Sequence, residues 1–350
     1  MMKRFQINLR RLCVALVGAV FFVSGILKLM DPVGTSLIVA EYLKFLRLSF
    51  MIPASKAIGV ALALVETLSG AAMLAGLWRR VMSYLVLIMM GAYTLLTVAL
   101  VIFNPAMDCG CFGEALHLSH GQSLVKNLAL LTLALIGYVP FRTGEKPRTA
   151  KFVVFGLVAA LVTWLCVYSL RNIPLVDFTE YRPATELGGS WSSDESAGAP
   201  VLSFTDQWGQ YMDGLALDGD VLVCSVHDPQ ALGWKDWAVV SQAVTDALCA
   251  GLQPLLLTPW LDGVPSDLVD YVYFADYKEL VTLNRSNGGY TLISDGMIVS
   301  KWARRHPQGM EQLAALEQAG YMETCLTRTV YGRIRLQGIM LVAAVALLII

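Results

Sequence analysis

Two cysteines separated by a single glycine, Cys109 and Cys111, lie in the sequence DCGCFGE between two long apolar runs. A disulfide between residues two positions apart closes a small, strained ring, and strain makes such a bond labile. Gly110 and Gly113 allow the backbone of this loop to adopt turn conformations that other residues avoid. The spacing therefore favours a pair that exchanges disulfides.

Two other interpretations of this loop stay open. Cys109 and Cys111 could join His117 and His120 as four metal ligands, although common zinc patterns place two or more residues between the cysteines. The loop could instead be a static turn or a structural disulfide. His117 and His120 could also serve as bases for the thiols.

Local charge acts on the two thiols in opposite directions. Asp108 and Glu114 should raise the pKa of a neighbouring thiol, whereas the amino end of a following helix should lower it. That helix is predicted to begin at Ser119, with Gln122 completing a capping box.

The elements that must position these cysteines are membrane helices. Hydrophobic residues make up 56% of the chain and charged residues only 15%, against about 25% charged residues in soluble domains. A net charge of −1 lacks the basic excess of a nucleic-acid-binding protein, so no nucleic-acid partner is expected. Apolar runs of spanning length lie at about 12–30, 57–77, 81–103, 123–140 and 152–170, with a shorter one from 334 to 350. The first run is too long for a signal peptide and lacks a cleavage site.

Basic residues predict the orientation of these runs in the bilayer. They cluster before the first run, between the second and third, and between the fourth and fifth, at Lys3, Arg4, Arg10, Arg11, Arg79, Arg80, Arg142, Lys146, Arg148 and Lys151. The positive-inside rule makes these loops cytoplasmic. DCGCFGE and segments 31–56 and 171–333 then face outward, to the periplasm of a bacterial inner membrane. The run at 334–350 is either a weak anchor or the end of an incomplete chain.

The segment 31–56 contains a predicted amphipathic helix. Glu41, Lys44 and Arg47 recur at every third residue among apolar side chains. Such a helix either lies in the membrane interface or packs on the bundle.

Several polar residues fall within or beside the apolar runs, in their outer halves. Glu66 is near the middle of the second run, Lys28 and Asp31 are at the end of the first, and Lys126 and Asn127 are in the first turns of the fourth. We expect one polar cluster in which Glu66 accepts a hydrogen bond from Lys28 or Lys126. Its role is to fix helix register or to form a proton-relay or quinone-facing site; alternatively, Lys28 reaches the surface without a partner.

These features together resemble a known family. FVSGILKLMDP (22–32), Glu66 followed by Gly70, Arg79–Arg80, DCGCFGE and Lys126–Asn127 are similar to the DoxX-like superfamily, and most to its methylamine utilisation MauE branch, over about residues 10–141. The resemblance implies a four-helix bundle in the bacterial inner membrane. MauE proteins are associated with maturing a disulfide-rich periplasmic enzyme subunit, and DoxX relatives with thiosulfate:quinone oxidoreduction. It therefore implies that Cys109 and Cys111 are a redox pair, with a periplasmic protein as substrate and a quinone as candidate electron acceptor.

The chain departs from a minimal MauE protein by adding a fifth helix and a large outer domain, so methylamine itself is not implied. Strands at 220–226 and 254–259, a hairpin at 290–302 and helices at 236–252 and 310–319 resemble a thioredoxin-like order. The CxxC motif is absent: Cys224 lies alone in a strand, and Gly289 replaces the usual proline. Cys224 and Cys249 are expected in the core, although disulfides Cys224–Cys249 or Cys249–Cys325 stay open.

The predicted fold is therefore an α-helical membrane protein with an α/β extracytoplasmic domain. The expected divisions are a DoxX/MauE-like bundle at 1–141, a loop and fifth helix at 142–171, a linker at 172–200, a thioredoxin-like domain at 201–327 and a C-terminal helix at 328–350. The predicted function is thiol–disulfide exchange by Cys109–Cys111, linked to a quinone. The alternative is a non-enzymatic membrane scaffold whose outer domain only binds a partner. A transporter is disfavoured because no paired, interrupted helices are present.

Overall fold

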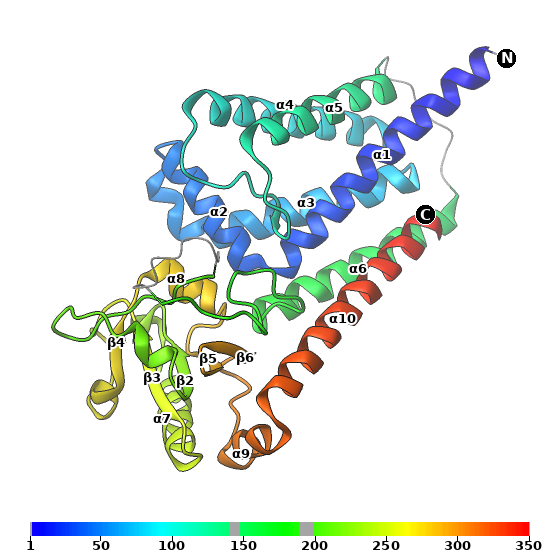
Figure 1. Ribbon diagram of the computed structural model, residues 1–350. Coiled ribbons are helices and arrows are strands. Elements are labelled where there is room, and N and C mark those ends of the chain that lie inside the picture. The colour runs from blue at the N-terminus through cyan, green and yellow to red at the C-terminus, as the bar shows by residue number, and fades with distance from the viewer. Residues whose placement is uncertain (1, 140–147, 190–198, 350) are drawn as a thin grey trace. The chain divides into compact units, whose positions relative to one another are not determined.

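The computed structural model (Figure 1) describes residues 2–139, 148–189 and 199–349. The chain forms two compact units, one of Met1–Arg171 with Gly338–Ile350 and one of Asn172–Gln337. We call them the membrane unit and the sheet unit. Residues 140–147, which include Arg142 and Lys146, and residues 190–198 of the predicted linker lie outside the described residues.

The membrane unit is built from helices. They are α1 (Met2–Met30), α2 (Pro32–Phe45), α3 (Ser55–Ala75), α4 (Arg79–Phe103), α5 (His120–Tyr138) and α6 (Thr149–Arg171), with a 3-10 turn at Ser49–Ala54 and a short strand β1 (Cys111–Glu114). Among the described residues, four segments are long and apolar enough to cross a membrane: Phe5–Met30, Ser49–Ala75, Arg79–Phe103 and Thr149–Arg171. The chain is thus an α-helical, multi-pass membrane protein. The predicted spans at α5, with its polar first turns, and at α10 (Tyr321–Ile349), with three arginines, are not among the four.

Small residues allow α1 and α3 to pack closely. A Cβ atom on Gly25 would lie 2.2 Å from Thr67 Oγ1, and one on Gly70 would lie 2.4 Å from the Phe22 backbone nitrogen. Only glycine fits at such crossings, as is common where membrane helices touch. Helix α5 packs against both α1 and α4, and α4 and α5 lie side by side in Figure 1. This packing brings residues of α1, α3, α4 and α5 around one space.

Helix α2 packs on the bundle, against α3. Its first turn is fixed by Asp31, whose carboxylate accepts a hydrogen bond from the Gly34 amide at 2.9 Å. The helix ends at Phe45, and Arg47 has a left-handed φ of 58°. The predicted charged stripe therefore loses Arg47, because the chain turns before reaching it.

The sheet unit has a five-stranded sheet in the order β4-β3-β2-β5-β6. Its strands are β2 (Asp220–Ser225), β3 (Gln253–Thr258), β4 (Val272–Phe274), β5 (Gly289–Ser294) and β6 (Met297–Trp302), and its helices are α7 (Trp234–Cys249), α8 (Tyr277–Leu283) and α9 (Met310–Ala319). Strands β2, β3 and β4 are parallel, and β5 and β6 form an antiparallel hairpin. The predicted order of strand, helix, strand, hairpin and helix is present, with β4 and α8 added. The thioredoxin-like assignment stays a prediction.

The cysteines of the sheet unit are free thiols. Cys224 is fully buried in β2, whereas Cys249 is exposed at the end of α7, which corrects its predicted place in the core. Cys325 is buried and donates to the Ile298 carbonyl at 3.4 Å. The two disulfides left open by the sequence, Cys224–Cys249 and Cys249–Cys325, are therefore not formed.

The predicted linker at 172–200 is partly built into the sheet unit. Lys301 pairs with Asp177 at 2.7 Å, and the Ala184 amide donates to the Ile298 carbonyl at 2.8 Å. Tyr181 is buried and donates to the Val201 carbonyl at 2.8 Å. These contacts fix the described residues 177–187 on the hairpin strand β6, so this stretch is part of the domain.

Candidate functional site

The cysteine loop turns tightly under helix α2. Gly110 has a φ of 60°, and a Cβ atom there would lie 2.3 Å from Ile38 Cγ2. The Gly113 amide donates to the Gly110 carbonyl at 3.1 Å. The turn places the sulfur atoms of Cys109 and Cys111 3.1 Å apart as free thiols. One proton can be shared between them, and a disulfide can form with little backbone movement.

Two hydroxyl groups hold the backbone of this loop in place. Tyr42 of α2 donates to the Cys109 carbonyl at 2.6 Å, and Ser24 of α1 donates to the Cys111 carbonyl at 2.6 Å. Burial, followed by the neighbouring Cys109 thiol, raises the pKa of Tyr42, so this hydroxyl remains a donor. Neither Tyr42 nor Ser24 was predicted for this site, because no sequence motif marks either residue.

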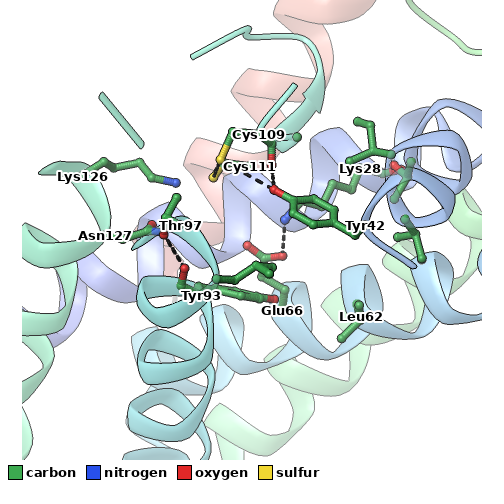
Figure 2. A pocket seen from close by; sticks show the side chains of 16 residues that line it. Lys28, Tyr42, Leu62, Glu66, Tyr93, Thr97, Cys109, Cys111, Lys126 and Asn127 are labelled. Carbon is green, nitrogen blue, oxygen red and sulfur yellow. Dashed lines mark hydrogen bonds and ion pairs between the residues drawn. The ribbon is translucent and has the colours of Figure 1, made fainter. Parts of the chain in front are cut away.

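The two thiols open on a cavity of about 120 Å³ within the membrane unit (Figure 2). Its lining is Lys28, Thr35, Ile38, Val39, Tyr42, Gly59, Leu62, Glu66, Tyr93, Leu96, Thr97, Cys109, Gly110, Cys111, Lys126 and Asn127. Aliphatic side chains form one part of the wall, and two lysines, a carboxylate and the thiols form another. Leu62 is 43% exposed on the outer surface of α3, so this wall borders the apolar surface of a membrane helix.

Lys28 and Glu66 form a buried ion pair beside this cavity. Lys28 Nζ lies 2.6 Å from Glu66 Oε2, with 13% and 5% of the side chains exposed. The Lys28 ammonium also lies 5.9 Å from the centre of the Tyr93 ring. Of the two donors that the sequence allowed for Glu66, the structure uses Lys28.

Lys126 is directed to the cysteines. Its ammonium lies 4.9 Å from the centre of the Phe112 ring, and its positive charge lowers the pKa of the Cys111 thiol. Asn127, one residue later, donates to Thr97 Oγ1 at 2.8 Å and to the Tyr93 carbonyl at 3.3 Å. Lys126 therefore lies beside the Cys111 thiol, and Asn127 connects α5 to α4. The hydrogen bond to Glu66 comes from Lys28 and not from Lys126.

Asp31 lies outside this cavity, contrary to its predicted place in the polar cluster. It is only 6% exposed, but its carboxylate caps α2. The preference of a helix amino end for a carboxylate explains this position.

The two thiols titrate very differently. The hydrogen bond from Cys109, then the ammonium groups of Lys126 and Lys28, lower the pKa of Cys111 to about 5, against the opposing effect of burial. The hydrogen bond to Cys111, followed by burial, raises the pKa of Cys109. At neutral pH Cys111 is therefore the thiol that ionises, and Cys109 retains the proton.

The neighbouring histidines contact groups other than the thiols. His117 Nδ1 lies 3.2 Å from the exposed Asp108 carboxylate, and His120 Nε2 lies 2.9 Å from the Met107 carbonyl. Lysines, and not Asp108 or Glu114, dominate the charge felt by Cys111. Among the described residues, no three His, Cys, Asp or Glu side chains are grouped to hold a metal ion.

Replacing Lys126 tests the charge that activates Cys111. The Lys126→Met substitution removes a lowering influence, so the pKa of Cys111 rises and the thiolate protonates at a higher pH. If the pKa rises by about one unit, alkylation of Cys111 should slow by about threefold at pH 5.5 and by up to about tenfold well below pH 5, since one pKa unit is a tenfold change in the protonation equilibrium. Above pH 8 the rates should converge. The measurement is the pH profile of iodoacetamide labelling, resolved by mass spectrometry, with Lys126→Arg as the charge-preserving control; coincident Met and wild-type profiles would contradict it.

Comparison with known proteins agrees with this geometry. Residues 7–140 match the model of the family described as methylamine utilisation protein MauE. No curated protein and no solved structure matches the chain significantly. The matched range covers α1 to α5 and includes both cysteines, Lys28, Glu66 and Lys126. The predicted MauE resemblance is confirmed, and the domain that holds this cavity is a MauE-family membrane domain.

Proposed function

We propose that the protein is a membrane thiol oxidoreductase in which Cys109 and Cys111 exchange disulfides with a protein on the periplasmic side of a bacterial inner membrane. The observation that carries this proposal is the pair of sulfur atoms 3.1 Å apart with opposite pKa shifts. A structural turn needs no stabilised thiolate. A disulfide-exchanging pair needs one, because a stabilised thiolate is a good nucleophile and a good leaving group.

Exchange proceeds through one mixed disulfide. In the oxidised protein, a thiolate of the partner attacks Cys111 Sγ; the Cys109–Cys111 bond breaks, and Cys109 takes the electron pair and a proton from the second thiol of the partner, which becomes a thiolate. The second partner thiolate then attacks the partner sulfur in the mixed disulfide, and Cys111 leaves as a thiolate. The partner loses two electrons and gains a disulfide, and the cysteine pair becomes a thiol and a thiolate. Cys111 faces the partner, since it is half-buried whereas Cys109 is 4% exposed.

Renewed oxidation of the pair requires an acceptor of two electrons. The cavity suits a quinone in its donor set: Lys28 and Lys126 are cationic donors for carbonyl oxygens, and Ile38, Val39 and Leu62 are apolar walls for a flat ring. Remaking the disulfide from the Cys109 thiol and the Cys111 thiolate releases two electrons and one proton, which a bound quinone would take up together with a second proton from water. The chain's own part is to hold the Cys111 thiolate at the cavity wall and to keep charged donors beside it.

A non-enzymatic scaffold is the second candidate, and the sheet unit favours it. Cys224, at the place where a thioredoxin-like domain would carry its dithiol, is fully buried in β2. Burial raises the pKa of this thiol to about 12, so it is unreactive at neutral pH. The sheet unit can then only bind a partner, and any exchange chemistry resides in the membrane unit.

The reduction potential of the cysteine pair separates the two candidates. We expect a value near or above about −200 mV for the purified protein, in the range of exchanging disulfides. The stabilised Cys111 thiolate favours the reduced state and so raises the potential. Thiol labelling across a series of glutathione redox buffers gives the value, with Cys249→Ser removing the exposed cysteine that could obscure it. A potential below about −300 mV, or the lack of a reversible pair, would support the scaffold.

A further inference from the structure

Exposed aromatic side chains gather at one edge of the sheet unit. Trp208, Trp234, Trp260, Leu261 and Tyr277 are 81%, 77%, 40%, 45% and 44% exposed. We call these five residues the aromatic rim. Large aromatic residues are enriched at interfaces and are the commonest binding hot spots, so exposed tryptophans on several neighbouring loops indicate a binding surface.

The topology places the loops of the aromatic rim together. Strands β2, β3 and β4 are parallel neighbours, so their carboxyl ends meet at one edge of the sheet. Trp234 opens α7 after β2, Trp260 and Leu261 follow β3, and Tyr277 opens α8 after β4. The backbone of Thr205 pairs with Phe274 at the end of β4, which adds the loop that carries Trp208.

Side-chain contacts tie these loops to one another. Gln230, after β2, donates to Asp262, after β3, at 2.9 Å. The ring of His227, after β2, lies edge-on to Tyr277 with 5.7 Å between ring centres. Trp208 stands at the tip of a tight turn in which its amide donates to Asp206 at 2.9 Å. The rim is therefore presented by linked loops on a rigid sheet, which limits the ordering cost of binding.

The charge around the aromatic rim indicates the sign of the charge that a partner should carry. Segment 172–337 holds 21 of the 27 acidic residues of the chain but only 10 of its 26 basic residues. The rim loops themselves carry Asp206, Asp228, Asp262 and Asp276 against Lys235 and Lys278. Such a field attracts a cationic partner and repels the surface of anionic lipids.

We propose that the aromatic rim binds a basic segment of a partner protein, with aliphatic or aromatic side chains of that segment on the tryptophans and its Lys or Arg side chains beside the aspartates. This binding goes beyond the thiol chemistry and does not require it. The rim would concentrate a basic partner near the membrane, with an on-rate that falls as the salt concentration rises.

Peptide binding to the full chain in neutral phosphatidylcholine nanodiscs tests the rim. The probe is a short fluorescein-labelled peptide that alternates lysine with leucine and tyrosine, and empty nanodiscs give the background. We expect saturable binding that weakens with salt and disappears when glutamate replaces lysine in the peptide. The paired substitution Trp234→Ala and Trp260→Ala should reduce affinity by about tenfold or more, because two hot-spot side chains are lost.

Matched variants make each outcome decisive. Leu248→Ala and Met310→Ala remove exposed apolar side chains elsewhere on the sheet unit and should bind as wild type. The paired Cys109→Ser and Cys111→Ser variant should also bind normally, so a failed exchange assay would leave this result intact. Absence of binding, binding of the glutamate peptide, or wild-type affinity in the tryptophan variant would each overturn the proposal. So would quenching of the rim tryptophans by brominated lipid, since the rim would then lie on the bilayer.

Discussion

Cys109→Ser should accumulate mixed disulfides between this protein and its partners, whereas Cys111→Ser should form none. In this variant the Cys111 thiolate can still attack a disulfide of an oxidised partner, but the Cys109 thiol that would attack Cys111 Sγ and release that partner is missing. The Lys126 and Lys28 ammonium groups still lower the pKa of Cys111 in that variant. A free cysteine has only a few per cent of thiolate at pH 7; the two ammonium groups hold the thiolate content of Cys111 above that level, and the serine hydroxyl can replace the Cys109 thiol as hydrogen-bond donor. The complexes should therefore form quickly and persist.

The expected loss of turnover is large in both variants. A single cysteine cannot complete a two-electron exchange, so oxidation of a dithiol peptide should fall to background. The measurement is non-reducing electrophoresis with mass spectrometry of trapped partners, together with the rate of peptide oxidation. Cys249→Ser, which removes the exposed cysteine of α7, should leave both readouts unchanged. Trapping through Cys111→Ser, but not through Cys109→Ser, would show that the assigned roles are reversed.

The helices could be predicted because they depend on local composition. One ion pair could be predicted because it depends on how deep its residues lie within their apolar runs. The lengths of the apolar runs predicted where the helices lie. Ser119 and Gln122 form the predicted capping box at the start of α5. The depth of Glu66 in its run limited its partners to lysines at the same level. Lys28 meets it because Gly25 and Gly70 bring α1 against α3. This close approach fixes which face of each helix turns inward.

The chemistry of the cysteines could not be predicted from neighbouring residues in the chain. Asp108 and Glu114 adjoin the thiols in sequence, yet Lys126 and Lys28 are the charges that lower the pKa of Cys111. The packing of α1 and α5 directs these two lysine side chains toward the cysteine loop. Tyr42 reaches the Cys109 carbonyl only because α2 folds back over α3. Sequence spacing gives the level of a residue along a helix, but tertiary packing decides where its side chain points.

Glu66→Leu should destabilise the membrane unit strongly, because Lys28 would remain as an unpaired ammonium in an apolar interior. Breaking a buried ion pair by removing one partner costs about 3–5 kcal/mol. Thermal unfolding in detergent should show a clear decrease in Tm, with Glu66→Gln in between, since an amide oxygen can still accept from Lys28. The double variant Lys28→Met with Glu66→Leu should recover most of the loss, because replacing both charges by apolar groups is often neutral. A Tm for Glu66→Leu equal to that of wild type would show that Lys28 finds water or another partner.

The stable double variant then decides between two roles for this ion pair. If Lys28 and Glu66 only fix helix register, the variant should oxidise a dithiol peptide at the wild-type rate when a soluble quinone is supplied. If the ion pair passes protons to the quinone, quinone-coupled turnover should fall and its pH profile should change. Loss of Lys28 also removes one of the charges that lower the pKa of Cys111, so alkylation of Cys111 must be measured in the same variant. With the quinone at a saturating concentration, which offsets the loss of Lys28 as a donor to it, a turnover defect larger than the alkylation defect assigns the pair to proton transfer, because thiolate content alone would reduce both rates equally.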